Sequence, residues 1–346
     1  MSAIVFDDTL LDEVDGLARA DLRLRALAES GARLRREAMS ANETLVQARD
    51  RLPEQQPRAV VAAGPDSRLL RAVLEPVCPV PFVAWPRHGL PGWVGSLDLV
   101  VVLAPEGNDP SVAATVAEAN RRGCQLIVFA PAKSLVAEHS GGRYAVLVPT
   151  QTSDHSAVAV AALDLLSRLH LGPEVNTEYL AKALEDVAVD CSPFKESTIN
   201  PAKILAIGLA DASPVMWGTS PLAARAARRF AEAVRAATGR AALAGLADQI
   251  GPMLEAAEPT DLFADPFVDD ATTGTTGHKT VLVVLDDGND DPHVLHDRAK
   301  LEGAAQANRL RIETINPAVD GELARYAAML LIGQYAAVYL QVGQGH

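Results

Sequence analysis

The sequence predicts an α/β protein with two doubly wound, parallel-sheet domains in tandem, and three observations support this fold class. Nearly continuous apolar runs of strand length alternate with segments whose apolar residues recur at helical spacing. The length of 346 residues suits two domains of ordinary size. Apolar residues make up 49% of the chain but aromatic residues only 4%, which favours small-residue helices packed closely on a sheet.

The clearest βαβ unit covers residues 96–131. A strand is predicted at 97–103, a helix at 111–122 that ends at Gly123, and a second strand at 126–129. In open α/β sheets ligands bind at the carboxyl ends of the strands, where the N-terminus of the next helix favours anions. The loop at 104–110 is therefore the first candidate for a binding site.

The rest of the first half follows the same two periodicities. Residues 7–50 predict a helical stretch whose apolar face includes Leu11, Val14, Leu22 and Leu24, and the basic cluster at 33–37 is expected to face solvent. Further strands are predicted at 59–63, 80–84 and 144–149, and further helices at 68–75 and 154–171. Because Gly172 and Pro173 end the last helix, the domains are predicted to cover residues 1–172 and 173–346.

In the second half, Ser220 and Pro221 are a typical N-cap and first helical residue. Strands are predicted at 214–217, 280–285 and 310–315, and helices at 174–185, 222–237, 293–308 and 322–342. The threonine and glycine run at 272–277 predicts a flexible linker. The last helix contains Arg325 and Gln334, which favours a buried or subunit-facing helix over a membrane span.

The two halves share a plan. VVVLAPEGNDPSV at 100–112 is echoed by VLVVLDDGNDDPHV at 281–294, and a strand–glycine–helix connection occurs at both Gly64 and Gly218. Duplication of one α/β domain explains the echo, while the alternative is that any two βαβ units look alike.

Charge and cysteine content exclude several classes of protein. A net charge of −13 argues against nucleic-acid and anionic-membrane surfaces. Cys78, Cys124 and Cys191 lie far apart, so neither a zinc site nor a disulfide framework is indicated. The acidic N-terminus has no basic region of a secretion signal, and a cytoplasmic protein without a cofactor is expected.

The order and spacing of these elements resemble the sugar isomerase (SIS) fold. More narrowly, the chain resembles the bifunctional phosphoglucose/phosphomannose isomerase family in its divergent actinobacterial form, most strongly at PVMWGTSPLAARAARRFAE (214–232) and LLIGQYAAVYLQVGQG (330–345). The resemblance implies two tandem SIS-type domains, a hexose phosphate as ligand, a homodimer, and a partner enzyme of mannose-phosphate metabolism as a candidate.

The resemblance also implies substrate-binding positions on the loops after the strands. These are Gly64 and Ser67 in the first loop, Gly107, Asn108 and Ser111 in the second, His155 where the family has an arginine, and Gly218, Thr219 and Ser220 in the second half. In the second loop, Glu106 and Asp109 replace the hydroxyl donors of the family. Their carboxylates accept hydrogen bonds and repel a dianionic phosphate.

The catalytic groups implied by the family look absent. Aldose–ketose isomerisation needs a base and a ring-opening acid. The position of the family's glutamate base corresponds to Ala236, with Glu232 one turn earlier as the only weak candidate. No histidine occurs between His170 and His278, and Lys300 is the last lysine. We therefore predict an inactive relative. The alternatives are an isomerase that uses Glu232 and a neighbouring subunit's histidine, and an interaction protein without a ligand.

Three smaller features have two interpretations each. His293, His296 and Asp297 with the acidic loop at 286–291 could bind a metal, but a solvated helix start is favoured and no metal is predicted. Thr219 and Ser220 could bind an anion or simply cap a helix. Lys195, Ser197 and Thr198 could border a cleft or belong to an ordinary linker.

Overall fold

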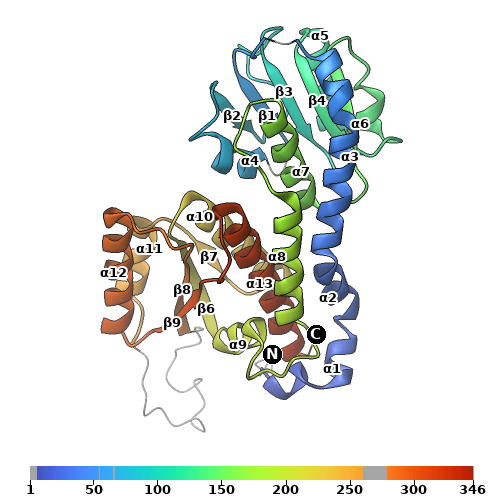
Figure 1. Cartoon of the computed structure of the whole chain (residues 1–346). Helices are drawn as coiled ribbons and strands as arrows, with labels where there is room; N and C mark the ends of the chain where they lie inside the picture. Colours follow the sequence, from blue (N-terminus) through green and yellow to red (C-terminus); the bar gives the residue numbers. More distant parts are fainter. Residues whose placement is uncertain (1–5, 54, 65–66, 260–278, 346) are drawn as a thin grey trace. The chain divides into compact units, whose positions relative to one another are not determined.

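The computed structural model describes residues 6–53, 55–64, 67–259 and 279–345. Contacts divide the chain into two compact units. The first-sheet unit is Glu29–Lys182, and the second-sheet unit joins residues 6–28 to 183–345. Each unit contains one all-parallel sheet with helices packed on it (Figure 1). The predicted α/β class with two tandem parallel sheets is confirmed, whereas the division of the chain at residue 172 stays a prediction.

The first sheet has the strand order β2-β1-β3-β4-β5. Its strands are β1 (Val60–Ala63), β2 (Phe82–Trp85), β3 (Leu99–Leu103), β4 (Gln125–Ala130) and β5 (Ala145–Pro149). Its helices are α3 (Ser30–Arg51), α4 (Ser67–Leu74), α5 (Pro110–Arg121), α6 (Leu135–Glu138) and α7 (His155–Arg168), and α8 (Thr177–Asp190) leads out of it.

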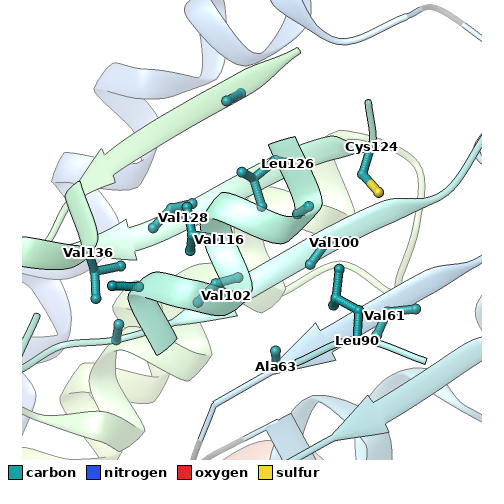
Figure 2. Packing of buried hydrophobic residues seen from close by; sticks show 14 of the residues in the cluster. Val61, Ala63, Leu90, Val100, Val102, Val116, Cys124, Leu126, Val128 and Val136 are labelled. Atoms are coloured by element: carbon teal, nitrogen blue, oxygen red, sulfur yellow. The ribbon is translucent and has the colours of Figure 1, made fainter. Parts of the chain in front are cut away.

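The core of the first-sheet unit lies on the central strands. Every residue of β1, β3 and β4 is buried, as the continuous apolar runs predicted for strands covered on both faces. Alternate side chains, Val100 and Val102 of β3 and Leu126 and Val128 of β4, share one cluster with Val116 of α5 (Figure 2). This packing fixes the carboxyl ends of the strands beside the N-terminus of α5.

The second sheet has the order β7-β6-β8-β9. Its four strands correspond in order to β2, β1, β3 and β4 of the first sheet, and it has no counterpart of β5 among the described residues. Its strands are β6 (Ala212–Gly218), β7 (Leu243–Ala244), β8 (Lys279–Leu285) and β9 (Arg311–Ile315). Its helices are α9 (Pro201–Gly208), α10 (Pro221–Thr238), α11 (Ala247–Glu255), α12 (Pro292–Ala307) and α13 (Glu322–Gly343). The shared order supports the common plan inferred from the sequence.

Helix α13 is the core helix of the second-sheet unit. Among the described residues it is the one helix long and apolar enough to cross a membrane, yet 72% of its apolar window is buried inside the structure. Tyr335 and Tyr339 are fully buried on it. This burial agrees with the prediction of a buried helix.

The N-terminal helical stretch differs from its prediction. It is broken into η1 (Asp8–Leu11), α1 (Val14–Ala18), α2 (Asp21–Ala28) and α3. Leu11 and Leu24 are buried, but Val14 and Leu22 are 81% and 83% exposed. Because each helix begins with its own orientation, apolar residues of different helices do not share one face. The prediction of a single apolar face along residues 7–50 was therefore wrong. The predicted linker at 272–277 lies outside the described residues.

Candidate functional site

The loops after β1 and β3 meet at the carboxyl edge of the first sheet. Gly64 has φ +105°, and a Cβ there would lie 2.2 Å from the carbonyl oxygen of Leu103. Only glycine allows this approach of the two strand ends. Helix α5 then begins with Asp109 as N-cap and Pro110 as its first residue. The N-terminus of α5 therefore lies near the end of β1, and both line one cavity.

Asp109 is held by the first turn of α5. Its Oδ1 accepts hydrogen bonds from the Ser111 hydroxyl at 2.7 Å and the Ser111 amide at 2.8 Å. The side-chain bond, followed by the backbone bond, holds the pKa of Asp109 below its ordinary value, and nearby His88 acts in the same direction. Asp109 is thus a carboxylate whose charge is stabilised at this edge.

A small cavity of about 110 Å³ opens at this place. It brings Gly64 and Ser111, two of the predicted binding residues, together with Asp109 and Thr115 of the β3–α5 region. Its remaining lining residues come from the ends of β1 and α5 and from the loop after β2, and are Ala63, Pro86, Arg87, His88 and Val112.

Arg87 and His88 are exposed cationic or titratable side chains that the sequence prediction missed. The Arg87 guanidinium lies over the Trp85 ring at 6.0 Å from its centroid. The Gly89 amide donates to Thr115 Oγ1 at 3.1 Å, which anchors this loop to α5. The signal was available, since basic residues directly after a predicted parallel strand lie at the ligand-binding edge.

The other predicted residues of the first sheet do not line this cavity. Gly107 packs tightly, because a Cβ there would lie 2.5 Å from Ser134 Cβ, and Asn108 beside it is exposed. Ser67 is fully buried, and its hydroxyl has no hydrogen-bond partner among the described residues. His155 begins α7, with its Nε2 3.6 Å from a Glu106 carboxylate oxygen.

Carboxylates of this chain also accept hydrogen bonds from backbone amides at the start of α7 and in the loop before it. Asp154 caps α7 and pairs with Arg33 at 2.8 Å. Glu37 accepts from the amides of Gln151 at 3.0 Å and Thr152 at 2.6 Å, and its burial raises its pKa. The prediction that residues 33–37 face solvent holds for Arg36, which is exposed, but was wrong for Glu37, because α3 packs against β5 and α7 and turns Glu37 toward the loop between them.

In the second sheet, the predicted binding residues Thr219 and Ser220 lie directly after Gly218 at the start of α10. Ser220 caps the helix by accepting from the Ala223 amide at 3.1 Å. The hydroxyl of Thr219 donates to the carboxylate of Asp287 at 2.7 Å, and the hydroxyl of Ser220 donates to its other oxygen. The capping interpretation is therefore confirmed, and a buried carboxylate accepts the hydroxyl bonds that an anion would need.

Glu232 lies away from this loop. It is on an exposed part of α10, where it pairs with Arg229 at 2.9 Å. It lies eleven positions after Pro221 at the helix start, which is about 16 Å along the axis. The structure does not bring Glu232 together with Thr219 and Ser220.

The remaining candidates have structural partners. Among the described residues, no group of three or more His, Cys, Asp and Glu side chains could hold a metal ion, so His293 and His296 have no metal geometry around them. Lys195 pairs with Asp190, and the Ser197 amide donates to Asp12. The fully buried Lys203 also binds Asp12, at 2.8 Å, so this segment ties residues 6–28 to the second-sheet unit.

Known proteins share this architecture. Residues 198–346 match the family described as the bacterial phospho-glucose isomerase C-terminal SIS domain. Tagatose-6-phosphate ketose/aldose isomerase from Escherichia coli superposes with a TM-score of 0.62 at 13% identity, covering 92% of this chain and 90% of that one. The chain has the SIS fold. The C-terminal domain of glucosamine-fructose-6-phosphate aminotransferase from Francisella tularensis gives 0.59 at 10% identity, covering 90% and 95%.

The SIS match at 198–346 includes both stretches on which the predicted resemblance was based, 214–232 and 330–345. The similarity to bacterial phosphoglucose isomerases is therefore confirmed for this part of the chain. No curated protein sequence matches the chain. At the identities of the similar structures, the likeness shows the SIS fold and leaves the chemistry to the residues of this chain.

Proposed function

We propose that this SIS-fold chain binds a sugar phosphate at the first-sheet cavity and serves hexose-phosphate metabolism, including that of mannose, without isomerising its ligand. The supporting observation is the meeting of Gly64, Ser111 and the start of α5 with Arg87 and His88 around one cavity. Arg87 and His88 supply the donors that a phosphate needs. The further proposal of an actinobacterial branch of the bifunctional isomerase family depends on the sequence resemblance.

The cavity favours one orientation of such a ligand. Its volume of about 110 Å³ is below the roughly 300 Å³ at which small-molecule pockets begin, so it can enclose only one end of a hexose phosphate. Asp109 repels a phosphate but accepts hydrogen bonds from sugar hydroxyls. We therefore place the sugar hydroxyls beside Asp109 and the phosphate at the exposed rim, against Arg87 and His88.

The absence of isomerase activity is supported by the properties of the candidate bases. A general base works best when its pKa lies near the working pH. Asp109 has its pKa held below the ordinary carboxyl value, which makes it a weak base. Glu232 is ion-paired with Arg229 on an exposed helix surface. Neither residue combines a suitable basicity with a place in the cavity.

Binding is tested by thermal unfolding of the purified full chain with millimolar fructose-6-phosphate, glucose-6-phosphate and mannose-6-phosphate. We expect at least one of them to raise the melting temperature, and Arg87→Gln and His88→Gln to reduce the rise. Arg143→Gln is the matched control, because Arg143 stacks on Tyr144 at 5.1 Å and does not line the cavity. No rise with any hexose phosphate would favour an interaction protein without a ligand.

Catalysis is tested by a coupled assay with fructose-6-phosphate and mannose-6-phosphate. We expect no turnover above the background. The contending function is an active isomerase in which Glu232 is the base and a neighbouring subunit gives a histidine. Turnover by the wild type that is lost in Glu232→Gln and kept in Arg229→Gln would establish that function instead.

The proposal includes a cytoplasmic homodimer and a partner enzyme of mannose-phosphate metabolism. The apolar helix α13 supports the dimer only in part, since most of it is buried within its own unit. Light scattering of the purified chain measures the dimer directly. Co-elution with the purified phosphomannose-converting enzymes of the same cell tests the partner, and a lone monomer in both experiments would contradict this part.

A further inference from the structure

The two sheets differ at one edge. In the first sheet, β5 lies beside β4 with Leu126 opposite Ala145 and Ala130 opposite Pro149, and α3 contacts it, with Arg51 donating to the Ala145 carbonyl at 3.1 Å. In the second sheet, β9 holds the position of β4. Among the residues that the structure describes, no strand lies beyond β9, and the chain passes from β9 to α13.

A cavity of about 480 Å³ lies at this edge of the second-sheet unit. We name it the β9 slot. Its walls are the second half of α8, helix α9, the strand β9 with the loop that follows, and α13. Apolar side chains form most of the walls, and those used below are Val187, Ile204, Leu205 and Ile332.

The backbone of β9 presents hydrogen-bonding groups to the slot. The Asp286 amide donates to the Ile315 carbonyl at 2.9 Å, so Ile315 turns its polar groups toward β8. In a parallel pair, alternate residues bond the same neighbour and the residues between them point the other way. Thr314 therefore directs its N–H and C=O away from β8, and it is an exposed residue of the slot. An unpaired strand edge of this kind is a template for another strand.

The charges in β9 do not shield this edge. Charged side chains often protect edge strands from pairing. Arg311, however, donates to the carbonyl of Gly208 in α9, and Glu313 packs against the same glycine, where a Cβ would lie 2.5 Å from its carboxylate oxygen. Both side chains are thus turned to α9.

The charge of the slot selects the partner. Among the described residues, the lining contains three carboxyl side chains, Asp186, Asp190 and Glu313, and no lysine, arginine or histidine. Lys195 pairs with Asp190 at 2.6 Å, and the charge of Arg311 attracts the Glu313 carboxylate. A basic side chain is therefore favoured beside the slot, and an acidic segment is disfavoured.

We propose that the β9 slot receives an extended strand of a partner protein, which pairs with the edge of β9, buries apolar side chains against Ile204 and Leu205, and places a basic residue near Asp186 and Glu313. The first sheet supports a strand as the occupant, because β5 fills the corresponding edge there. Strand addition to a sheet edge combines backbone bonds for affinity with side-chain pockets for specificity. The proposal does not depend on sugar-phosphate binding at the first sheet.

The test uses a fluorescent peptide with the sequence of residues 142–150, GRYAVLVPT, as a probe strand with one basic residue. We expect a saturable rise in its anisotropy when the full chain is added. Ile204→Arg should weaken binding at least tenfold. Leu295→Arg is the matched control, since Leu295 on α12 is 48% exposed and Ile204 is 46% exposed.

Two further variants examine the backbone and the charge. Thr314→Pro removes the outward N–H of β9 and should also weaken binding tenfold or more, with retained folding checked by circular dichroism. A peptide with Arg143→Glu should bind more weakly than the original. Absence of saturable binding, or equal binding by Ile204→Arg and Leu295→Arg, would overturn the proposal. So would a wild-type dimer that Ile204→Arg turns into a monomer while no peptide binds, because a second copy would then fill the slot.

Discussion

The two sheets carry similar loops that differ in the groups around them. After β3 and after β8, a glycine with φ +72° or +78° precedes, by two or three residues, an aspartate that caps the next helix. Asp109 and Asp291 each accept an amide at 2.8 Å. The residue before the glycine differs in its surroundings. The Glu106 side chain is 77% exposed, whereas Asp287 is 6% exposed and bonded to two hydroxyls.

This difference shows that the loop backbone and the loop chemistry are set separately. The glycine, the aspartate cap and the proline fix the turn in both sheets. Whether the carboxylate before the glycine is buried or exposed depends on the neighbouring strand–helix connection. In the second sheet, Thr219 and Ser220 follow Gly218, whereas Pro65 and Asp66 follow Gly64 in the first. In the second sheet, hydroxyls next to the loop hold the carboxylate inside, and the start of α10 is bonded to the chain's own side chain.

The largest difference in unfolding free energy is expected between Asp287→Ala and Glu106→Ala. Removal of Asp287 leaves the Ser220 hydroxyl without its acceptor and leaves the Thr219 hydroxyl only the longer bond to the Leu285 carbonyl at 3.3 Å, which should cost about 3 kcal/mol of unfolding free energy. Removal of the exposed Glu106 should cost no more than about 0.5 kcal/mol. Urea unfolding of both variants measures the difference, and equal losses would show that Asp287 is not held as described.

Asp287→Ala has a second expected consequence. Its freed hydroxyls lie at the N-terminus of α10, so inorganic phosphate should raise the melting temperature of this variant more than that of the wild type. Glu106→Ala serves again as the control, because no such hydroxyl pair is exposed by it. An equal response of the two variants would contradict the assignment of the self-bonded site.

A smaller contrast is expected between Gly107→Ala and Gly288→Ala. Both residues have positive φ, so an alanine costs about 1 kcal/mol in each. At Gly107 the new Cβ would also meet Ser134 Cβ at 2.5 Å and Pro131 Cδ at 2.8 Å. At Gly288 its nearest neighbour is the flexible end of Arg325, at 3.3 Å. We expect a total of about 3 kcal/mol for Gly107→Ala and about 1 kcal/mol for Gly288→Ala by urea unfolding. The reverse order would contradict the loop packing.

The sequence predicted those parts of the fold that depend on local pattern. The strands at 97–103, 126–129 and 280–285 were found because burial on both faces requires a continuous apolar run, and β3, β4 and β8 agree with them closely. β7 has only two residues, Leu243 and Ala244, and offers no such run. Strands of four or more residues, including the edge strands β2 and β9, are therefore visible in this sequence, and the two-residue strand β7 is not.

The polar partners of the candidate sites could be predicted less well, because they are distant in the chain. Glu37 bonds an amide 114 residues away, and Thr219 bonds Asp287 across 68 residues. Neither pairing leaves a periodic signal in the sequence. The position of a loop at the carboxyl edge could be predicted from its place after a strand, but which carboxylate occupies that loop is decided by tertiary packing.

The smallest effects on stability are expected when two buried glutamates are replaced by glutamine. These are Glu37 in the first-sheet unit and Glu313 in the second. Burial, the largest cause for each, raises both pKa values above the ordinary 4.5. Since the folded pKa exceeds the unfolded one, the contribution to stability is present below the unfolded pKa and is lost as pH rises through the folded pKa. At pH 7 each group therefore carries a penalty that glutamine would remove.

The two substitutions should nevertheless differ at pH 7. Glu313→Gln should raise the melting temperature, because the Coulombic attraction of Arg311 offsets the burial of its carboxylate only in part. Glu37→Gln should raise the melting temperature less, or lower it. The substitution removes the cost of burying the charge, but it also removes the charged acceptor of the Gln151 and Thr152 amides. Melting curves from pH 7 to pH 4 should show the advantage of Glu313→Gln shrinking as the wild-type glutamate becomes protonated. A constant advantage over this range would mean that packing, and not the buried charge, sets the stability at β9.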